Sequence, residues 1–270
     1  MAGYTWIELG PYGYLPTDAA RLGDELAQRS LKVAGGTVHG VGGLHRAEDW
    51  EAAVDKTRKV ADLTSALGGQ HVVFVPVPGY RDDVSGAFLE PAELDDAAWR
   101  ALVGMSNELG KIVCEEFGLT LEFHEHADSH VETQAQIERF LDETDPRYVS
   151  LCLDTGHVAY RAGDSLALIR NYPERIGYVH IKQVDPEIAR VANADGIPFA
   201  EAVKRGVCVE PPRGQPDAGS IIAALRQLDR HLFVVVEQDL FPCAFDAPLP
   251  IAIRTREYLN ACGLGSAEEV

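Results

Sequence analysis

The segment LCLDTGH, residues 151–157, decides the fold that we predict for this chain. It begins as a run of apolar residues and ends in two ionisable side chains, Asp154 and His157. A short apolar run of this kind is typical of a strand that is covered on both faces, as in a parallel sheet. Because ionisable groups at the edge of a core are costly without partners, we expect a partner for these two residues.

Six other apolar runs resemble this one and alternate with helical patterns along the chain. We expect strands at residues 4–10, 31–38, 71–77, 119–125, 149–156, 176–183 and 232–239. Thr133 and Gln136 form a capping box that predicts the start of one helix. Asp164 and either Asp217 or Ser220 are expected to cap two more, and a last helix is expected at residues 249–262. Strict alternation of strands and helices predicts βα units, a parallel sheet and right-handed crossovers.

Two architectures fit this alternation: a doubly wound open sheet and a TIM (β/α)8-type barrel. A doubly wound nucleotide-binding protein carries a glycine-rich turn that opens a helix directly after a strand. The stretch VAGGTVHGVGG, residues 33–43, is rich in glycine, but the chain contains neither GxGxxG at such a turn nor GxxxxGK[ST]. Ionisable residues follow strand after strand instead, as in a barrel whose site lies at the carboxyl ends of the strands. We therefore predict a TIM-type α/β barrel that forms a single domain over residues 1–270.

The charge balance is strongly acidic, with 42 Asp and Glu residues against 24 Lys and Arg residues and a formal net charge of -18. A surface of this sign repels phosphate backbones and anionic membranes, so we expect no nucleic-acid partner. No window of about 18 apolar residues predicts a membrane span.

The N-terminal stretch MAGYTWIELG lacks the basic and apolar regions of a signal peptide. The five cysteines are odd in number and form no CxxC pair, so nothing requires an oxidising compartment. Cys114 and Cys152 lie in apolar segments and are expected to be small buried thiols. The sequence therefore predicts a cytoplasmic protein.

Four consecutive predicted strands end in ionisable residues. These are Glu122, His124, Glu125 and His126 on the first of the four, then Asp154 and His157, then His180 and Lys182, and finally Glu237 and Asp239. Because the carboxyl ends of barrel strands converge, Glu122, Asp154, His180 and Glu237 are predicted to meet around one point. This set, which is rich in oxygen ligands, suits a divalent metal ion such as Mn, Co, Mg or Zn. A shared cation would also offset the burial of the carboxylates.

Other candidate residues lie outside the strand ends. Glu8 ends the first predicted strand and could bind substrate, and Tyr12 in the turn that follows could line a pocket or simply pack in that turn. Arg213 lies in the loop VEPPRGQPD, residues 209–217, where it could contact substrate oxygens or belong to an ordinary surface loop. We assign His130 and Glu132 to the entry of a helix.

Four motifs carry a resemblance to a known family: LDTGH (153–157), VHIKQV (179–184), VVVEQD (234–239) and ELGPYGYLPTD (8–18). The chain resembles the xylose isomerase-like TIM barrels, and within them the inosose (2-keto-myo-inositol) dehydratases and related sugar isomerases and epimerases. The resemblance covers residues 4–262 and implies a divalent metal at the barrel mouth that holds a keto-sugar or polyol. His157 and Lys182 match positions that line the site.

The chain departs from the family in two respects. Many dehydratase-like members have an HxH cluster without the preceding glutamate, whereas this chain has both in LEFHEH, residues 121–126. His124 or His126 could therefore replace Glu122 as a ligand, or bind substrate. In addition, the sequence starts where relatives finish the helix after their first strand, so seven strands can be identified instead of eight. We expect a truncated or open barrel with an exposed edge beside residues 4–10 and 232–239.

The resemblance predicts a metal-dependent lyase that dehydrates an inosose-like keto-polyol through an enediolate. Glu122 or Glu237 would act as the base, and the other carboxylate, His157 or Lys182 would act as the acid. The same groups would serve a sugar isomerase or ketose 3-epimerase. A non-catalytic sugar-binding subunit, with or without formation of a homo-oligomer, is a further alternative. An abasic-site endonuclease shares the fold, but the net charge of -18 argues against it.

Overall fold

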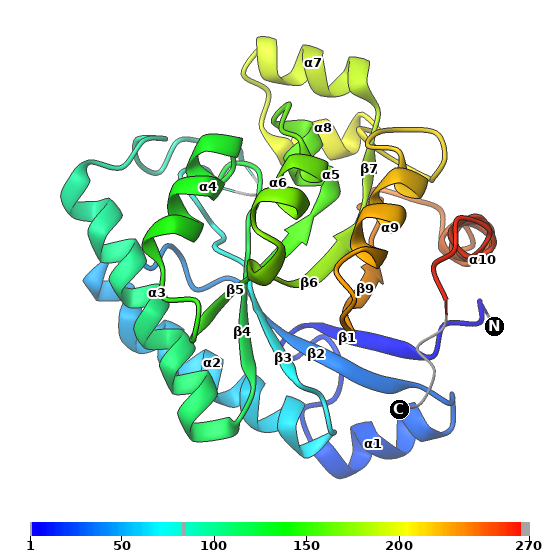
Figure 1. The fold of residues 1–270 in the computed structure, drawn as a ribbon, viewed down its shortest axis with the longest axis horizontal. Helices are drawn as coiled ribbons and strands as arrows, with labels where there is room; N and C mark the ends of the chain where they lie inside the picture. The colour runs from blue at the N-terminus through cyan, green and yellow to red at the C-terminus, as the bar shows by residue number, and fades with distance from the viewer. Residues whose placement is uncertain (1, 83–84, 266–270) are drawn as a thin grey trace.

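Seven parallel strands form the central sheet of the computed structural model, which describes residues 2–82 and 85–265 (Figure 1). Each of the seven predicted strands is present, and the barrel is nearly closed, which confirms the predicted TIM-type architecture. In the order in which they pair, the strands are β1 (Trp6–Pro11), β2 (Lys32–Val38), β3 (His71–Phe74), β4 (Thr120–His124), β5 (Val149–Asp154), β6 (Ile176–Ile181) and β9 (Phe233–Val236).

Helices surround the sheet and connect its strands (Figure 1). They are α1 (Ala19–Ala27), α2 (Trp50–Ala66), α3 (Asp96–Phe117), α4 (Gln134–Glu143), α5 (Thr155–Tyr160), α6 (Ser165–Asn171), α7 (Pro186–Ala194), α8 (Phe199–Lys204), α9 (Ala218–Arg226) and α10 (Pro248–Ala261), with short 3-10 turns η1 (Ala47–Asp49) and η2 (Pro173–Arg175). Two short antiparallel strands, β7 (Gln183–Val184) and β8 (Cys208–Val209), pair beside the barrel mouth.

The predicted helix starts are confirmed by their capping contacts. Thr133 and Gln136 form a complete capping box at α4, and the Asp164 side chain accepts a hydrogen bond from the backbone of α6. Asp217, not Ser220, is the N-cap of α9, because its carboxylate accepts hydrogen bonds from both the backbone N–H and the hydroxyl of Ser220.

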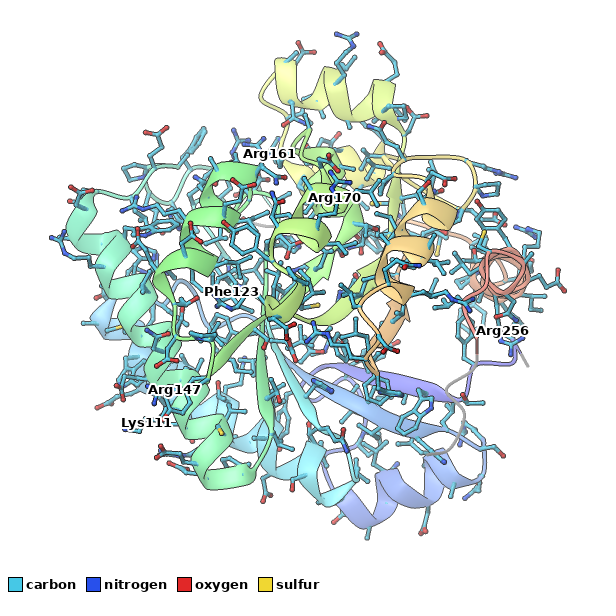
Figure 2. All side chains as sticks on the ribbon, viewed as in Figure 1. Lys111, Phe123, Arg147, Arg161, Arg170 and Arg256 are labelled. Carbon is cyan, nitrogen blue, oxygen red and sulfur yellow. The ribbon has the colours of Figure 1, made fainter. Side chains whose placement is uncertain are left out.

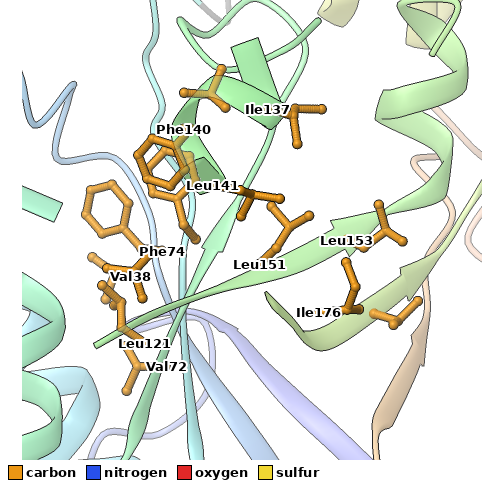
Figure 3. Packing of buried hydrophobic residues seen from close by; sticks show 14 of the residues in the cluster. Val38, Val72, Phe74, Leu121, Ile137, Phe140, Leu141, Leu151, Leu153 and Ile176 are labelled. Carbon is orange, nitrogen blue, oxygen red and sulfur yellow. The ribbon is translucent and has the colours of Figure 1, made fainter. Parts of the chain in front are cut away.

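The apolar residues of the strands divide between two sides of the sheet. Leu121, Leu151 and Leu153 face the helices and pack with residues of α4 (Figure 3). Cys152 and Tyr178 face the barrel interior, as expected from the alternation of side chains along a strand. Figure 2 shows Phe123 inside the molecule, whereas Lys111 and Arg147 lie at its outer surface.

The barrel has a gap between β1 and β9, each of which pairs with only one neighbour among the described strands. The rings of Trp6 and Phe233 make contact across this gap, with 4.9 Å between their centroids. Beside them lies a cavity of about 440 Å³ that extends from these rings to Glu8 and Glu237. The Tyr4 hydroxyl donates a hydrogen bond of 3.2 Å to the Ala252 carbonyl, which links the N-terminal segment to α10 at the side of the gap.

One sequence prediction about the cysteines is wrong. Cys152 is buried, but Cys114 is exposed. The helical period of α3 turns Leu109 and Val113 toward the core and places Cys114 on the opposite side, so an apolar neighbourhood in sequence did not imply burial. In residues 2–82 and 85–265, no helix combines the length and apolarity needed to cross a bilayer.

Candidate metal centre at the carboxyl ends of the strands

Four side chains from four neighbouring strands meet inside the barrel mouth: His124, Asp154, His180 and Glu237. The Asp154 Oδ2 atom lies 3.5 Å from His124 Nε2 and 3.8 Å from His180 Nδ1. His180 Nδ1 lies 3.4 Å from Glu237 Oε2. One atom from each residue can be chosen so that all four lie within 4.8 Å of one another, which makes this group a possible site for a divalent metal ion.

The hydrogen bonds of Asp154 leave one of its oxygens directed at this group. Its Oδ1 atom accepts hydrogen bonds of 2.8 and 2.9 Å from the backbone N–H groups of Gly156 and His157, and thereby caps α5. Its Oδ2 atom and His180 Nδ1 are buried and make no hydrogen bond among the described residues, although the Lys182 Nζ atom lies 3.2 Å from Oδ2. Because buried polar atoms in native proteins are nearly always satisfied, these two atoms fit the requirements of a cation site.

The Lys182 ammonium group lies beside the two carboxylates of this candidate metal group and beside a third carboxylate, that of Asp239. Its Nζ atom lies 3.2 Å from Asp154 Oδ2, 2.9 Å from Glu237 Oε2 and 3.0 Å from Asp239 Oδ2. Burial alone would lower the pKa of Lys182, but the three carboxylates raise this pKa well above its usual range. Lys182 is therefore a buried, charged donor whose positive charge offsets three negative ones.

The carboxylate of Asp154 is ionised for a related reason. Burial alone raises its pKa, but Lys182 and the His124 imidazole outweigh this effect and hold the pKa below its usual range. Asp239 was noted in the sequence as a strand-end residue but was not assigned to the site. Its spacing of two residues from Glu237 repeats the spacing of His180 and Lys182, and this repeat was a signal that could have identified it.

Two histidines border the cluster in their neutral form. His157 Nε2 lies 3.1 Å from Lys182 Nζ, and its other ring nitrogen accepts a hydrogen bond of 3.2 Å from the Ala127 N–H. Burial and the nearby Lys182 charge keep the pKa of His157 well below its usual range. The His126 ring contacts the His157 ring at 4.0 Å between centroids, and burial lowers the pKa of His126 to about 3.

Glu8 lies behind His180 at the edge of the gap. Its Oε2 atom is 2.9 Å from His180 Nε2, and its Oε1 atom accepts a hydrogen bond of 2.5 Å from the Thr37 hydroxyl. A carboxylate that engages the second nitrogen of a ligand histidine fixes the ring orientation and the tautomer. The structure therefore places Glu8, which the sequence suggested as a substrate contact, in position to orient His180.

Glu122 is not brought together with the other three predicted ligands. Its side chain is fully buried and pairs with His71, with 2.8 Å between Oε1 and Nδ1. In register it lies opposite Val73 and Ser150, whereas His124 lies opposite Cys152, nearer the strand ends. Burial raises the pKa of Glu122, and His71 opposes this rise. The geometry therefore replaces Glu122 with His124 in the candidate metal group, one of the alternatives that the LEFHEH motif left open.

The two remaining sequence candidates lie outside the cluster. Tyr12 is 36% exposed in the turn after β1. Arg213 is exposed in the loop after β8, and its backbone N–H donates a hydrogen bond of 2.9 Å to the carbonyl of Glu210. The Glu210 carboxylate in turn pairs with both guanidinium donors of Arg254, at 2.7 and 2.9 Å.

Comparison with known proteins assigns the chain to a family. Residues 1–260 match the family described as xylose isomerase-like TIM barrel. A relative from Bacillus velezensis named inosose dehydratase is 31% identical over 265 residues, covering 97% of this chain and 85% of the relative.

Two solved structures share the fold. An L-ribulose 3-epimerase matches with a TM-score of 0.72 and 19% identity, covering 97% of this chain and 84% of its own. The IolI protein with a bound zinc atom matches with a TM-score of 0.70 and 17% identity, covering 96% of this chain and 87% of its own. The chain belongs to the xylose isomerase-like TIM barrel family.

Proposed function

We propose that this member of the xylose isomerase-like TIM barrel family is a metal-dependent hydro-lyase that removes water from an inosose-like keto-polyol. The observation that carries the proposal is the convergence of His124, Asp154, His180 and Glu237 beside the Lys182 ammonium group. The near full-length similarity to relatives named inosose dehydratase supports the same activity and suggests 2-keto-myo-inositol as the substrate to test.

The residues fit a divalent cation by their chemistry as well as by their spacing. Two imidazole nitrogens and two carboxylate oxygens suit Mn, Co or Zn better than Mg, which prefers oxygen ligands and bound water. When bound, the metal would supply Lewis-acid polarisation of the substrate carbonyl. Glu8 would hold the His180 ring in the orientation that this role requires.

Glu237 is the group that we assign as general base. Partial burial raises its pKa, but His180 and Lys182 outweigh this effect and keep the pKa well below its usual range, so the group is a carboxylate at neutral pH. It is also the most accessible member of the candidate metal group, with its side chain 33% exposed against 0% for Asp154. A base that removes the proton next to a carbonyl must reach the substrate, and this exposure allows it.

Lys182 is the group that we assign as general acid for the departing hydroxyl. The carboxylates of Asp154 and Glu237 hold it protonated in the structure. A cation held by these two carboxylates would leave Lys182 with Asp239 and His157 as neighbours and would lower its pKa toward the range of an effective acid. The buried His157 ring, whose Nε2 lies 3.1 Å from Nζ, would limit the movement of the lysine side chain.

The location of Glu122 favours a lyase over a 3-epimerase. An epimerase removes a proton from one face of a carbon and returns one to the other face, so it needs acid and base groups on both sides. The second carboxylate that the sequence offered for this purpose, Glu122, is buried against His71 and lies apart from the cluster. Sugar isomerisation or epimerisation remains the alternative activity, and metal-dependent sugar binding without turnover is the non-enzymatic one.

The proposal is tested by incubating the purified protein with 2-keto-myo-inositol and identifying the product. We expect loss of water, inhibition by EDTA, and recovery of activity with Mn or Co. The Glu237→Gln variant should lose activity, whereas the surface control Glu143→Gln should keep it. Full activity in metal-free enzyme together with an unaffected Glu237→Gln variant would refute the proposal, and an epimer as product would support the isomerase alternative.

We also propose that the protein works in the cytoplasm and forms a homo-oligomer. All five cysteines are free thiols, which supports a reducing compartment and hence the cytoplasm.

Phe241, Phe245 and Leu249 are exposed apolar side chains near the start of α10, and they support formation of a homo-oligomer.

A further inference from the structure

A second cluster of histidines and a carboxylate lies away from the candidate metal centre. His45, Glu90 and His130 come from the three loops that follow β2, β3 and β4, and one ligand atom from each lies within 4.8 Å of the other two. His45 Nε2 is 3.0 Å from Glu90 Oε2, and His130 Nε2 is 3.8 Å from Glu90 Oε1. The cluster shares no residue with the candidate metal centre.

The two imidazole rings of this cluster are buried and adjacent. Each histidine side chain is 5% exposed, and the ring centroids are 4.7 Å apart. His45 Nδ1 is buried without a hydrogen-bond partner among the described residues, although its ring lies in a polar environment. A buried ring nitrogen without a partner is unusual in a native protein and calls for a ligand or a water.

The other contacts of the cluster are polar contacts that a bound cation would have to displace. Arg46 contacts Glu90 at 3.3 Å but makes a shorter pair of 2.6 Å with Asp49. His130 Nε2 also lies 3.1 Å from the Pro91 carbonyl. Burial and the neighbouring His45 lower the pKa of His130, which favours the neutral imidazole that binds metals.

We propose that His45, Glu90 and His130 form a second divalent cation site, selective for Zn²⁺ or Co²⁺, at the rim of the barrel. Zinc binds nitrogen and oxygen ligands at about 2.0–2.2 Å, so tetrahedral ligand atoms lie roughly 3.3 Å apart. In the cluster, the Glu90 carboxylate presents Oε2 to His45 Nε2 at 3.0 Å and Oε1 to His130 Nε2 at 3.8 Å, so each imidazole lies close to one of its oxygens. Two imidazoles and a carboxylate are a ligand set that zinc accepts, and a water molecule would complete the tetrahedron.

The ion would join three loops that the backbone does not connect directly. Residues 45, 90 and 130 are far apart in sequence and lie on the side of the barrel formed by β2, β3 and β4. Binding to the folded state alone stabilises a protein by mass action. We therefore expect the rim site to stabilise these loops and to take no part in the chemistry at the strand ends.

The test is metal stoichiometry in chelator-treated protein that is dialysed against ZnCl₂ and analysed by elemental analysis. The variants are His45→Gln for the rim site, His180→Gln for the candidate metal centre, and His231→Gln as an exposed-histidine control. Wild type and the control should bind two equivalents, and each of the other two variants should bind one. A Co²⁺ titration adds visible absorption bands: the band of the rim site should be lost in His45→Gln and remain in His180→Gln, and the band of the candidate metal centre should show the reverse.

The experiment tests metal binding at the rim site and at the candidate metal centre separately. If only the rim site binds metal, wild type and His180→Gln both bind one equivalent and His45→Gln binds none, which still supports the proposal. If His45→Gln, shown to be folded by circular dichroism, binds as many equivalents as wild type, the proposal is wrong. Glu90→Gln provides the same comparison should His45→Gln not fold.

Discussion

Similar strands are buried to different extents on two sides of the barrel: the closed side, formed by β4, β5 and β6, and the side of the gap, where β9 lies. On the side of β4, β5 and β6, each strand has two neighbours, and Asp154, His180 and Lys182 are almost completely buried. On the side of the gap, β6 is the single partner of β9 among the strands of residues 2–82 and 85–265, and the Glu237 side chain is 33% exposed. Burial of a strand thus depends on both of its neighbours. In this protein the closed side buries three of the four candidate ligands, while the edge strand leads to the one that is partly exposed.

The largest expected effect comes from Asp154 on the closed side. Asp154→Asn removes a carboxylate from the candidate metal group and leaves Lys182 with one fewer partner in a buried site. We expect activity to fall by at least about 10³-fold and the free energy of unfolding to fall by about 3–5 kcal/mol, as when one partner of a buried ion pair is removed. Kinetic assays and urea unfolding measure both effects.

Glu237→Gln is the counterpart of Asp154→Asn on the edge strand. Its activity should fall by a similar factor, but its stability should change by less than about 1 kcal/mol because the side chain is partly exposed. Equal losses of stability in the two variants would contradict the proposed difference between the closed side and the edge.

Gly177 in β6 tests how tightly the closed side is packed. A Cβ atom at this position would lie 2.3 Å from Glu122 Oε2 and 2.7 Å from the Ser150 Cβ atom. Gly177→Ala should therefore destabilise the protein by about 2–3 kcal/mol, as overpacking of a core does. Gly104→Ala in α3, where no atom lies within 4 Å, should be neutral or stabilising by up to about 1 kcal/mol. Thermal unfolding of both variants makes the comparison.

A matched pair of valines compares the closed strand with the edge strand directly. Val179 in β6 and Val234 in β9 lie opposite each other in register, but Val179 is 0% exposed and Val234 is only partly buried. We expect Val179→Ala to cost about 2 kcal/mol and Val234→Ala about 1 kcal/mol or less, in proportion to the area each methyl group buries. Urea unfolding that gives the same cost for both would show that the gap is closed in solution.

A pH dependence of stability is expected to originate from His126 on the closed side. Burial lowers its pKa to about 3 in the folded protein, whereas the unfolded value is about 6.5. As the pH decreases, His126 therefore takes up a proton in the unfolded state before it does so in the folded state. The stabilisation is fully present above about pH 6.5, and below that pH the free energy of unfolding falls by about 1.4 kcal/mol per pH unit.

His126→Gln should reduce this acid slope when unfolding of metal-stripped protein is followed between about pH 6.5 and pH 4. The exposed control His231→Gln should change the slope less. A wild-type slope in the His126→Gln variant would show that His126 is protonated in the folded protein.

Much of the site could be predicted from the sequence because strand periodicity is a local property. Alternation placed Glu122 and His124 on the same inward face, and the structure agrees. Alternation could not decide which of the two residues lies at the level of the other ligands, because inward positions repeat about every 6.6 Å along a strand. The stagger between neighbouring strands decides this, and it places His124 level with Cys152 and Glu122 level with Ser150.

The sequence by itself determined the seven strands, their order of alternation with helices, the capped helix starts and the family. These features follow from local patterns of hydrophobicity and hydrogen bonding, which act between residues that are near in sequence. Only the tertiary structure decided that His71 pairs with Glu122, that Glu8 supports His180, and that three loops bring His45, Glu90 and His130 together. These contacts join residues that are 40 or more positions apart along the chain, and only the closure of the barrel brings such distant residues within reach.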